Sequence, residues 1–108
     1  DGLTPLMNAA ENGNVDTLKA ILEKVDDADY VNLMSNTGFT ALIIASAHGH
    51  VEAIEYLISK GAAVDAVHDN KVTALMYAAA AGHLDAMKAL IKAGADGLRL
   101  ERHRKGRR

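Results

Sequence analysis

Residues 40–50 read TALIIASAHGH, and residues 73–83 read TALMYAAAAGH. Two near copies of one eleven-residue stretch in a chain of 108 residues indicate an internal repeat, which dictates the whole fold. The pattern extends to the start of the chain. The equivalent threonines are Thr4, Thr40 and Thr73, and the glycines nine residues after them are Gly13, Gly49 and Gly82. We therefore predict three copies of one structural unit.

Each copy has the pattern of two short helices joined by a tight turn. The threonine is a good N-cap, because its side chain accepts a hydrogen bond from a free backbone N–H of the first turn. Pro5 follows Thr4 at a position where a missing N–H costs nothing. The glycine adopts a positive φ and stops the first helix. An apolar stripe at helical spacing then follows in each unit: Val15, Leu18, Ile21 and Leu22; Val51, Ile54, Leu57 and Ile58; Leu84, Met87, Leu90 and Ile91.

One such helix pair cannot bury its apolar stripe alone, whereas a stack of pairs can. The duplicated stretch thus forms the first helix and the turn of two successive units in the stack. The alternation of apolar and polar residues that marks a strand is absent from these stripes.

These residues resemble the ankyrin repeat, whose units follow the approximate pattern D-G-x-T-P-L-H-x-A-A-x-x-G-H, then an apolar helix and G-A-D. The matching segments are Asp1 to Leu6 with Ala9, Ala10 and Gly13; Thr37 to Leu42 with Ala45, Gly49, His50, Gly61 and Ala62; and Thr73 to Leu75 with Ala78, Ala79, Gly82, His83 and Gly94 to Asp96. The resemblance covers residues 1–96. It implies an all-α, ankyrin-repeat solenoid of stacked helix-turn-helix units with β-turn or hairpin loops. The units are expected at about 1–34, 35–67 and 68–96.

The sequence departs from the family pattern at several places. Met7, Ile43 and Met76 replace the family's histidine, so the hydrogen bonds of that histidine must be missing or replaced. Lys71 stands where the family has a turn glycine. The first junction, residues 23–30, is three residues longer and carries three aspartates. Acidic groups oppose the dipole at a helix C-terminus, so we expect the helix to end near Lys24.

The composition bears on where in the cell the protein is located. The chain has no Cys, which excludes disulfides and thiolate metal sites and favours a reducing, intracellular location, cytoplasmic or nuclear. No apolar run approaches the roughly 18 residues of a membrane helix, and no signal-peptide pattern opens the chain. Because the sequence begins at Asp1, we expect it to be a piece of a longer protein.

The histidines, aspartates, serines and glycines of the chain do not form a catalytic, metal-binding or phosphate-binding pattern. His50 and His83 repeat at one position of the unit, where they open the second helix. Asp27 and Asp29 lack the glycine and distal glutamate of a calcium loop, which favours a solvated junction over an acidic patch for a basic partner. The serines have no G-x-S-x-G setting, and the glycines mark unit boundaries rather than a phosphate loop. We predict no catalytic residue, no cofactor and no metal.

The expected function is to bind another protein through the concave face formed by loop tips and first helices, which the apolar stripes leave free. By resemblance to the family, we expect the binding residues to be Leu3, Glu11, Asn12, Asn36, Thr37, Phe39, Ala47, His48, Asp69, Asn70, Val72, Tyr77, Ala80 and Ala81. Each is otherwise an ordinary surface residue. Phe39 is either an anchor for the partner or a ring that packs under the next loop.

Residues 97–108 differ from the rest of the chain. They hold six basic groups and one acidic group, whereas residues 1–96 hold six and thirteen. The basic stretch is a disordered tail or a sequence artefact, a contact for nucleic acid, an import receptor or an anionic membrane, or a helical cap. The last unit has no evident polar cap over Leu90 and Ile91, so weak self-association is a further possibility.

Overall fold

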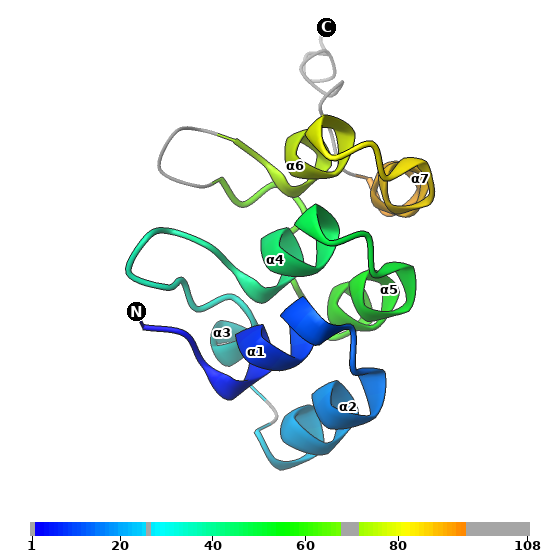
Figure 1. The fold of residues 1–108 in the computed structure, drawn as a ribbon. Coiled ribbons are helices and arrows are strands. Elements are labelled where there is room, and N and C mark those ends of the chain that lie inside the picture. The colour runs from blue at the N-terminus through cyan, green and yellow to red at the C-terminus, as the bar shows by residue number, and fades with distance from the viewer. Residues whose placement is uncertain (1, 26, 68–71, 95–108) are drawn as a thin grey trace, which may run out of the picture.

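The computed structural model describes residues 2–25, 27–67 and 72–94, and these ranges contain seven α-helices. Six of them form three pairs: α1 (Pro5–Asn12) with α2 (Val15–Lys24), α4 (Ala41–Ala47) with α5 (Val51–Ser59), and α6 (Ala74–Ala80) with α7 (Leu84–Lys92). The pairs stack in sequence order (Figure 1). The predicted all-α solenoid of stacked helix pairs is confirmed.

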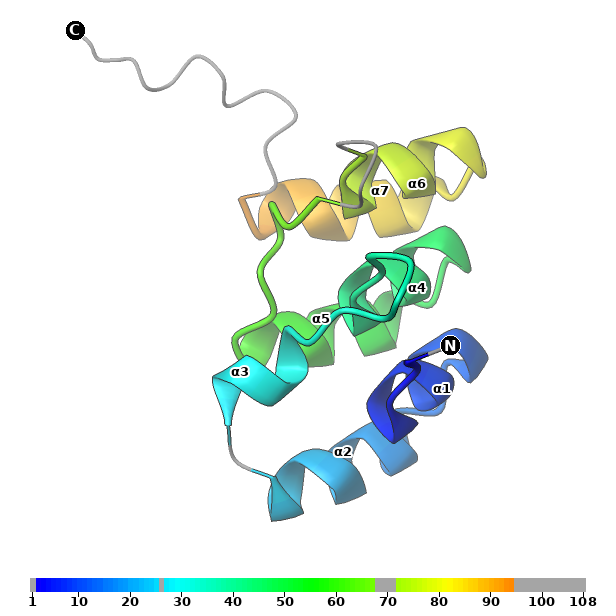
Figure 2. The same ribbon diagram turned by 90° about the vertical axis from the view of Figure 1, so that its left-hand side faces the viewer.

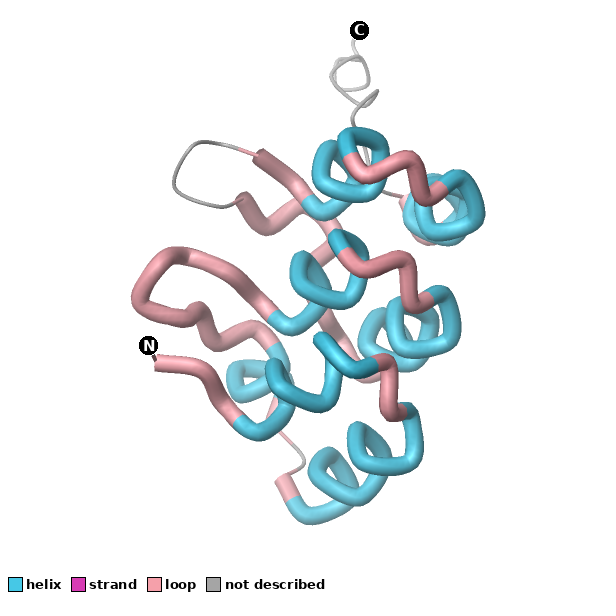
Figure 3. The backbone as a smooth tube through the Cα atoms, in the orientation of Figure 1, coloured by secondary structure: helices cyan, strands magenta, loops and turns pink. Residues whose placement is uncertain are grey.

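The first helices form one column and the second helices another. Helix α1 packs on α4 and α4 packs on α6, while α2 contacts α5 and α5 contacts α7. The layering is clearest from the side (Figure 2), and the loop before α4 projects away from the column of first helices (Figure 3). A face made of loops and first helices therefore lies opposite the second helices.

Each first helix begins as its sequence predicts. The hydroxyls of Thr4 and Thr40 accept hydrogen bonds from the backbone N–H groups three residues later, at 3.1 and 3.2 Å, and Thr73 does so at 3.3 Å. The glycines that follow the first helix of each pair, Gly13, Gly49 and Gly82, have φ between 69° and 78°. This left-handed conformation disfavours any residue with a Cβ, which is why the repeat keeps glycine there.

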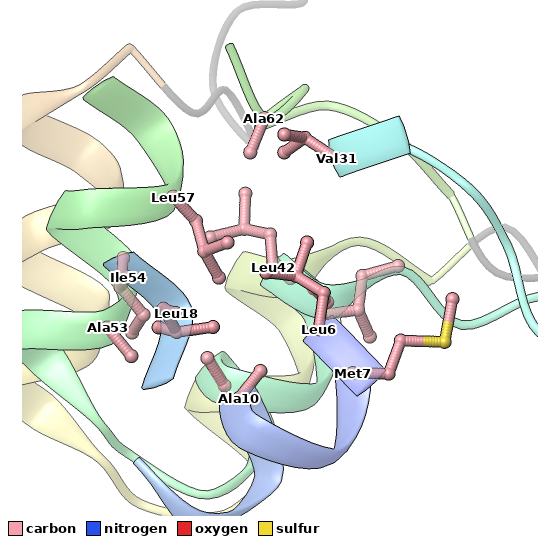
Figure 4. Close-up of a cluster of buried hydrophobic side chains, with 14 of the residues drawn as sticks. Leu6, Met7, Ala10, Leu18, Val31, Leu42, Ala53, Ile54, Leu57 and Ala62 are labelled. Atoms are coloured by element: carbon pink, nitrogen blue, oxygen red, sulfur yellow. The ribbon is translucent and has the colours of Figure 1, made fainter. Parts of the chain in front are cut away.

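The core is aliphatic and continuous through the stack. Leu6, Leu18, Leu42, Ile54 and Leu57 are among its fully buried members, and they converge between the two columns (Figure 4). Small residues bring the first helices close together, and the buried Ser46 among them is satisfied because its Oγ donates to the carbonyl of Leu42 at 2.7 Å. The equivalent residues in the other units are alanines.

The first junction contains an element that the sequence did not predict. Helix α2 ends at Lys24, as expected, but a short helix, α3 (Ala28–Val31), follows it. The Oδ1 of Asp27 accepts a hydrogen bond from the N–H of Asp29 at 2.9 Å, which organises the start of this turn. Val31 is buried and lies beside Ala62 (Figure 4). Helix α3 thus ends at a residue that packs in the core, and Val31 has the same spacing from Thr40 as Val64 has from Thr73.

The loop before α6 has a single antiparallel bridge between Val67 and Thr73. It is consistent with the predicted hairpin loop and is the only β-type pairing in the described ranges. The expected anomaly at Lys71 lies outside the described residues.

Candidate functional site: a pocket between the loop and the first helices

The loop before α4 is organised by Ser35. Its N–H donates to the carbonyl of Phe39 at 2.8 Å, and its Oγ accepts from the N–H of Phe39 at 3.1 Å. Gly38, buried with φ of 87°, donates its N–H to the carbonyl of Ser35 at 2.9 Å. These bonds close residues 35–39 into a compact turn and fix the backbone of Phe39.

Phe39 lies against the next unit. Its ring centroid is 5.6 Å from that of Tyr77 on α6, and the two planes are tilted by 58°. This is a favourable tilted geometry for two aromatic rings. The ring therefore packs against a helix of the next unit and remains half-buried. That Phe39 anchors a partner stays a prediction.

The two rings line a pocket of about 260 Å³ together with residues of α1 and α4. Its lining residues are Glu11, Phe39, Ile44, Ala47, His48 and Tyr77. Five of the six belong to the set that the sequence predicted, and they come from three successive units. Stacking thus brings together residues that are as far apart in the chain as Glu11 and Tyr77.

Glu11 and His48 form the polar part of this pocket. The imidazole of His48 is exposed and lies nearly parallel to that of His50, with ring centroids 6.1 Å apart. His50 is fixed from the other side, because its Nε2 donates to the carbonyl of Glu11 at 3.0 Å. The carboxylate of Glu11 thus borders a pocket whose other lining residues are mainly apolar.

Other predicted site residues do not line the pocket. Leu3, Asn12, Asn36, Thr37, Ala80 and Ala81 are exposed, and Val72 is half-buried. Asn12 donates through Nδ2 to the carbonyl of Asn8 at 3.1 Å, so its amide caps its own helix. Asp69 and Asn70 lie outside the described residues.

Two residues of the site were missed from the sequence. Ile44 lines the pocket, and its register is that of Tyr77, which was predicted; the shared register was the available signal. Ser35 does not line this pocket but positions Phe39. Nothing in the repeat pattern marks it, because the residue at the same position of the third unit is His68 and the first unit has no residue there.

Among the described residues, neither a metal-binding cluster nor a membrane-spanning helix is found. No group of three or more His, Cys, Asp and Glu among them is placed to hold a metal ion. None of the helices in residues 2–25, 27–67 and 72–94 is long and apolar enough to cross a membrane.

Stacked helix pairs with projecting loops define a helical-repeat solenoid. The family model described as "Ankyrin repeats (3 copies)" matches residues 6–101, and the chain belongs to this family. Ankyrin repeats are generally modules for protein–protein interaction rather than catalysts.

Known relatives carry the repeat within much longer chains. The protein is 42% identical over 64 residues to mouse Ankyrin repeat and SAM domain-containing protein 6, a match that covers 59% of this chain and 7% of that one. It is 41% identical over 64 residues to the Drosophila melanogaster Ankyrin repeat and KH domain-containing protein mask, covering 59% of this chain and 2% of that one. The chain thus spans a small fraction of these relatives.

A solved structure has the same fold. A chain in the structure of the Bd0816 predatory endopeptidase from Bdellovibrio bacteriovorus in complex with immunity protein Bd3460 superposes with a TM-score of 0.79 at 30% identity. The match covers 89% of this chain and 49% of that chain.

Proposed function

We propose that this chain is a non-catalytic, intracellular protein-binding module that holds its partner at the pocket between Phe39, Ile44 and Tyr77. The observation that carries the proposal is the pair of half-buried aromatic rings at the edge of an open apolar hollow. Aromatic residues that are rigid and only partly covered are the usual anchors of protein interfaces.

The size of the pocket favours a side chain over a free small molecule. Its volume of about 260 Å³ is below the roughly 300–1,000 Å³ that small-molecule sites occupy. The first helices of the neighbouring layers flank the pocket on both sides (Figure 3) and would extend the contact. We therefore assign to the partner an apolar side chain in the pocket and a Lys or Arg near Glu11, whose carboxylate would pair with it.

The first experiment is affinity capture with the 108-residue chain beside Phe39→Ala and Tyr77→Ala variants. Leu84→Ala is the matched control, because Leu84 is an exposed apolar residue on α7 that does not line the pocket. A protein retained by the unchanged chain and by the control, and lost from both pocket variants, is the expected result. Equal capture by all four proteins would remove the pocket from the interface.

Two further variants define the partner's chemistry once it is purified. Glu11→Gln keeps the size of the side chain and removes its charge, so it should weaken binding at low salt and reduce the salt dependence. Removal of residues 97–108 tests the alternative that the basic tail makes the contact with nucleic acid, an import receptor or an anionic membrane. Loss of all binding on that truncation, with the pocket variants unaffected, would favour the tail.

A further inference from the structure

A second pocket lies between two of the second helices. Helices α5 and α7 are neighbours in their column (Figure 1). The pocket between them, which we call the rear pocket, has a volume of about 420 Å³. Its lining residues are Glu55, Ile58, Ala89, Lys92 and Ala93. None of them lines the pocket of Phe39 and Tyr77, which we call the loop pocket, so the two are separate sites.

The layer below has an aromatic ring at the equivalent place. Tyr56 on α5 is equivalent in the repeat to Ala89 on α7. The ammonium groups of Lys19 on α2 and of Lys60 lie 5.9 and 5.7 Å from the centroid of the Tyr56 ring. The ring is half-buried and packs against the core. Between α2 and α5, therefore, the repeat places a ring in contact with both layers, where the next layer has only a methyl group.

The walls of the rear pocket differ from this filled place in two ways. Ala93 is equivalent to Lys60, so a second long side chain is missing beside Ala89. Glu55 is equivalent to Lys19, so an acidic group replaces a cation. The rear pocket is thus the position of an aromatic ring that this layer lacks, with a carboxylate on one rim.

Helix α7 presents different sides to the core and to the rear pocket. Leu90 was expected to need cover, but it is fully buried within the stack. Ala89 beside it is half-buried and lines the pocket, and Lys92 is exposed. Residues three apart share one side of a helix, so the ammonium group of Lys92 is placed to lie over a ring that rests on Ala89.

The chain itself has no free ring for this pocket. Its four aromatic residues are Tyr30, Phe39, Tyr56 and Tyr77, and all four are half-buried. Residues 95–108 contain no aromatic residue. Neither the tail nor a second copy of the chain therefore offers a freely exposed ring, and the occupant is a different molecule.

We propose that the rear pocket binds the aromatic side chain of a second protein, a Tyr or Phe with a Lys or Arg beside it in the sequence. The ring rests on Ala89 and Ile58 as Tyr56 does one layer below, Lys92 supplies the cation, and the basic neighbour pairs with Glu55. Three of the five lining residues are exposed, so the pocket is shallow. Small-molecule sites bury most of their ligand, whereas a docked protein needs only its ring covered here. This contact goes beyond the proposed function, because it uses a different face.

The first test titrates the isotope-labelled 108-residue chain with N-acetyl-tyrosinamide and, as the matched apolar probe, N-acetyl-leucinamide. Methyl NMR signals of Ile58 and Ala89 report the rear pocket, and those of Ile44 and Ala47 report the loop pocket. The rear signals should shift with the tyrosine probe at a dissociation constant on the order of 1 mM. The leucine probe should bind roughly two- to fivefold more weakly. Because each pocket has its own reporters, failure at the rear pocket leaves the proposed function to be judged separately.

Moving the ring tests the comparison between layers. Ala89→Tyr should fill the pocket from within and abolish the shift at Ile58. Ala20→Tyr is the matched control, since Ala20 is the equivalent exposed residue of α2 and lies outside the pocket. It should leave probe binding unchanged. Tyr56→Ala should open a second site between α2 and α5, reported by the methyls of Leu22, and circular dichroism verifies that each variant keeps its helices.

Charge substitutions test the two rims. Lys92→Gln should reduce the preference for the tyrosine probe, whereas Lys88→Gln, an exposed lysine of α7 outside the pocket, should leave it unchanged. The acetylated amides of tyrosyl-lysine and tyrosyl-glutamate test the partner's charge. The lysine peptide should bind roughly two- to fivefold more tightly at low salt, and Glu55→Gln should remove this difference.

Five results would overturn the proposal. No shift at Ile58 and Ala89 with the tyrosine probe would do so. Equal affinity for both probes would remove the aromatic ring from the occupant's description, and unchanged binding by Ala89→Tyr would place the probe elsewhere. Tighter binding of the tyrosyl-glutamate amide would reverse the charge assigned to the partner. Binding that appears only after removal of residues 97–108 would assign the pocket to the chain's own tail.

Discussion

The imidazole of His50 lies over the backbone of Gly13, and its Nε2 donates to the carbonyl of Glu11 at 3.0 Å. Because a carbonyl only accepts, Nε2 carries the proton in this arrangement. The contact ties the turn of the first unit to the start of the second helix in the next unit. It also places Glu11 beside the pocket, so the packing of two layers and the geometry of the candidate site depend on the same pair.

Replacing Gly13 and Gly82 by alanine should distinguish two costs. One is the strain of a left-handed backbone, and the other is the collision of the new Cβ with a neighbouring imidazole. Gly82→Ala should cost about 1–2 kcal/mol, because the left-handed φ is unfavourable for a residue with a Cβ. Gly13→Ala adds a collision with the His50 ring, so it should cost roughly 1–3 kcal/mol more. Urea unfolding of both variants measures the difference. Equal losses of unfolding free energy in the two variants would show that the His50 ring moves aside without cost.

Met7 and Met76 occupy the same position of the repeat in different surroundings. Met7→Ala should lower the free energy of unfolding by roughly 2–5 kcal/mol, since it removes a fully buried side chain from the contact between α1 and α4. Met76→Ala should cost less than about 1 kcal/mol, because half of that side chain is already in solvent. Thermal and urea unfolding of the two single variants are the measurement. A cost at Met76 as large as that at Met7 would contradict the open end of the stack.

Asn32 joins the first junction to the end of the second unit. Its Nδ2 donates to the carbonyl of Gly61 at 3.0 Å, and its Oδ1 accepts from the N–H of Ala63 at 2.8 Å. Asn32→Ala should therefore cost about 1–2 kcal/mol. Asn32→Asp is the control for the bond to Ala63, because it keeps that acceptor while it replaces the donor to Gly61 by an oxygen that repels the carbonyl. Hydrogen exchange at the N–H of Ala63 should accelerate in the alanine variant alone.

The sequence predicted those features that repeat. Thr4, Thr40 and Thr73 cap their helices as expected. The apolar stripes of the first two units pack against the core, whereas Leu84 and Ile91 of the third stripe are exposed. The features that it missed occur once. Helix α3 depends on a junction found only in the first unit, and Ser35 acts through the backbone of Phe39 rather than through a pattern of its own.

The sequence predicted most of the residues that line the candidate site, but not how they are arranged in space. The set included Glu11, Phe39 and Tyr77, yet only the stacked structure shows that these three border one pocket and that Leu3 and Ala81 do not line it. The distances across layers follow from how closely the first helices approach, which depends on small residues such as Ala45 and Ser46. A single sequence gives the identities of those residues and not the resulting separation.

Ser35 offers a test of whether the loop positions the aromatic anchor. Ser35→Ala leaves the N–H of Phe39 without its side-chain acceptor and should cost about 1–2 kcal/mol of stability. Because Phe39 would then leave its tilted contact with Tyr77, partner binding at the pocket should weaken as well, although Ser35 touches no part of it. Ser35→Thr keeps the hydroxyl and is the matched control. Calorimetric titration of partner against both variants, beside Phe39→Ala, measures the effect. Binding by Ser35→Ala that equals the unchanged chain, together with the expected loss of stability, would show that Phe39 is held by Tyr77 alone and that the loop plays no part in presenting it.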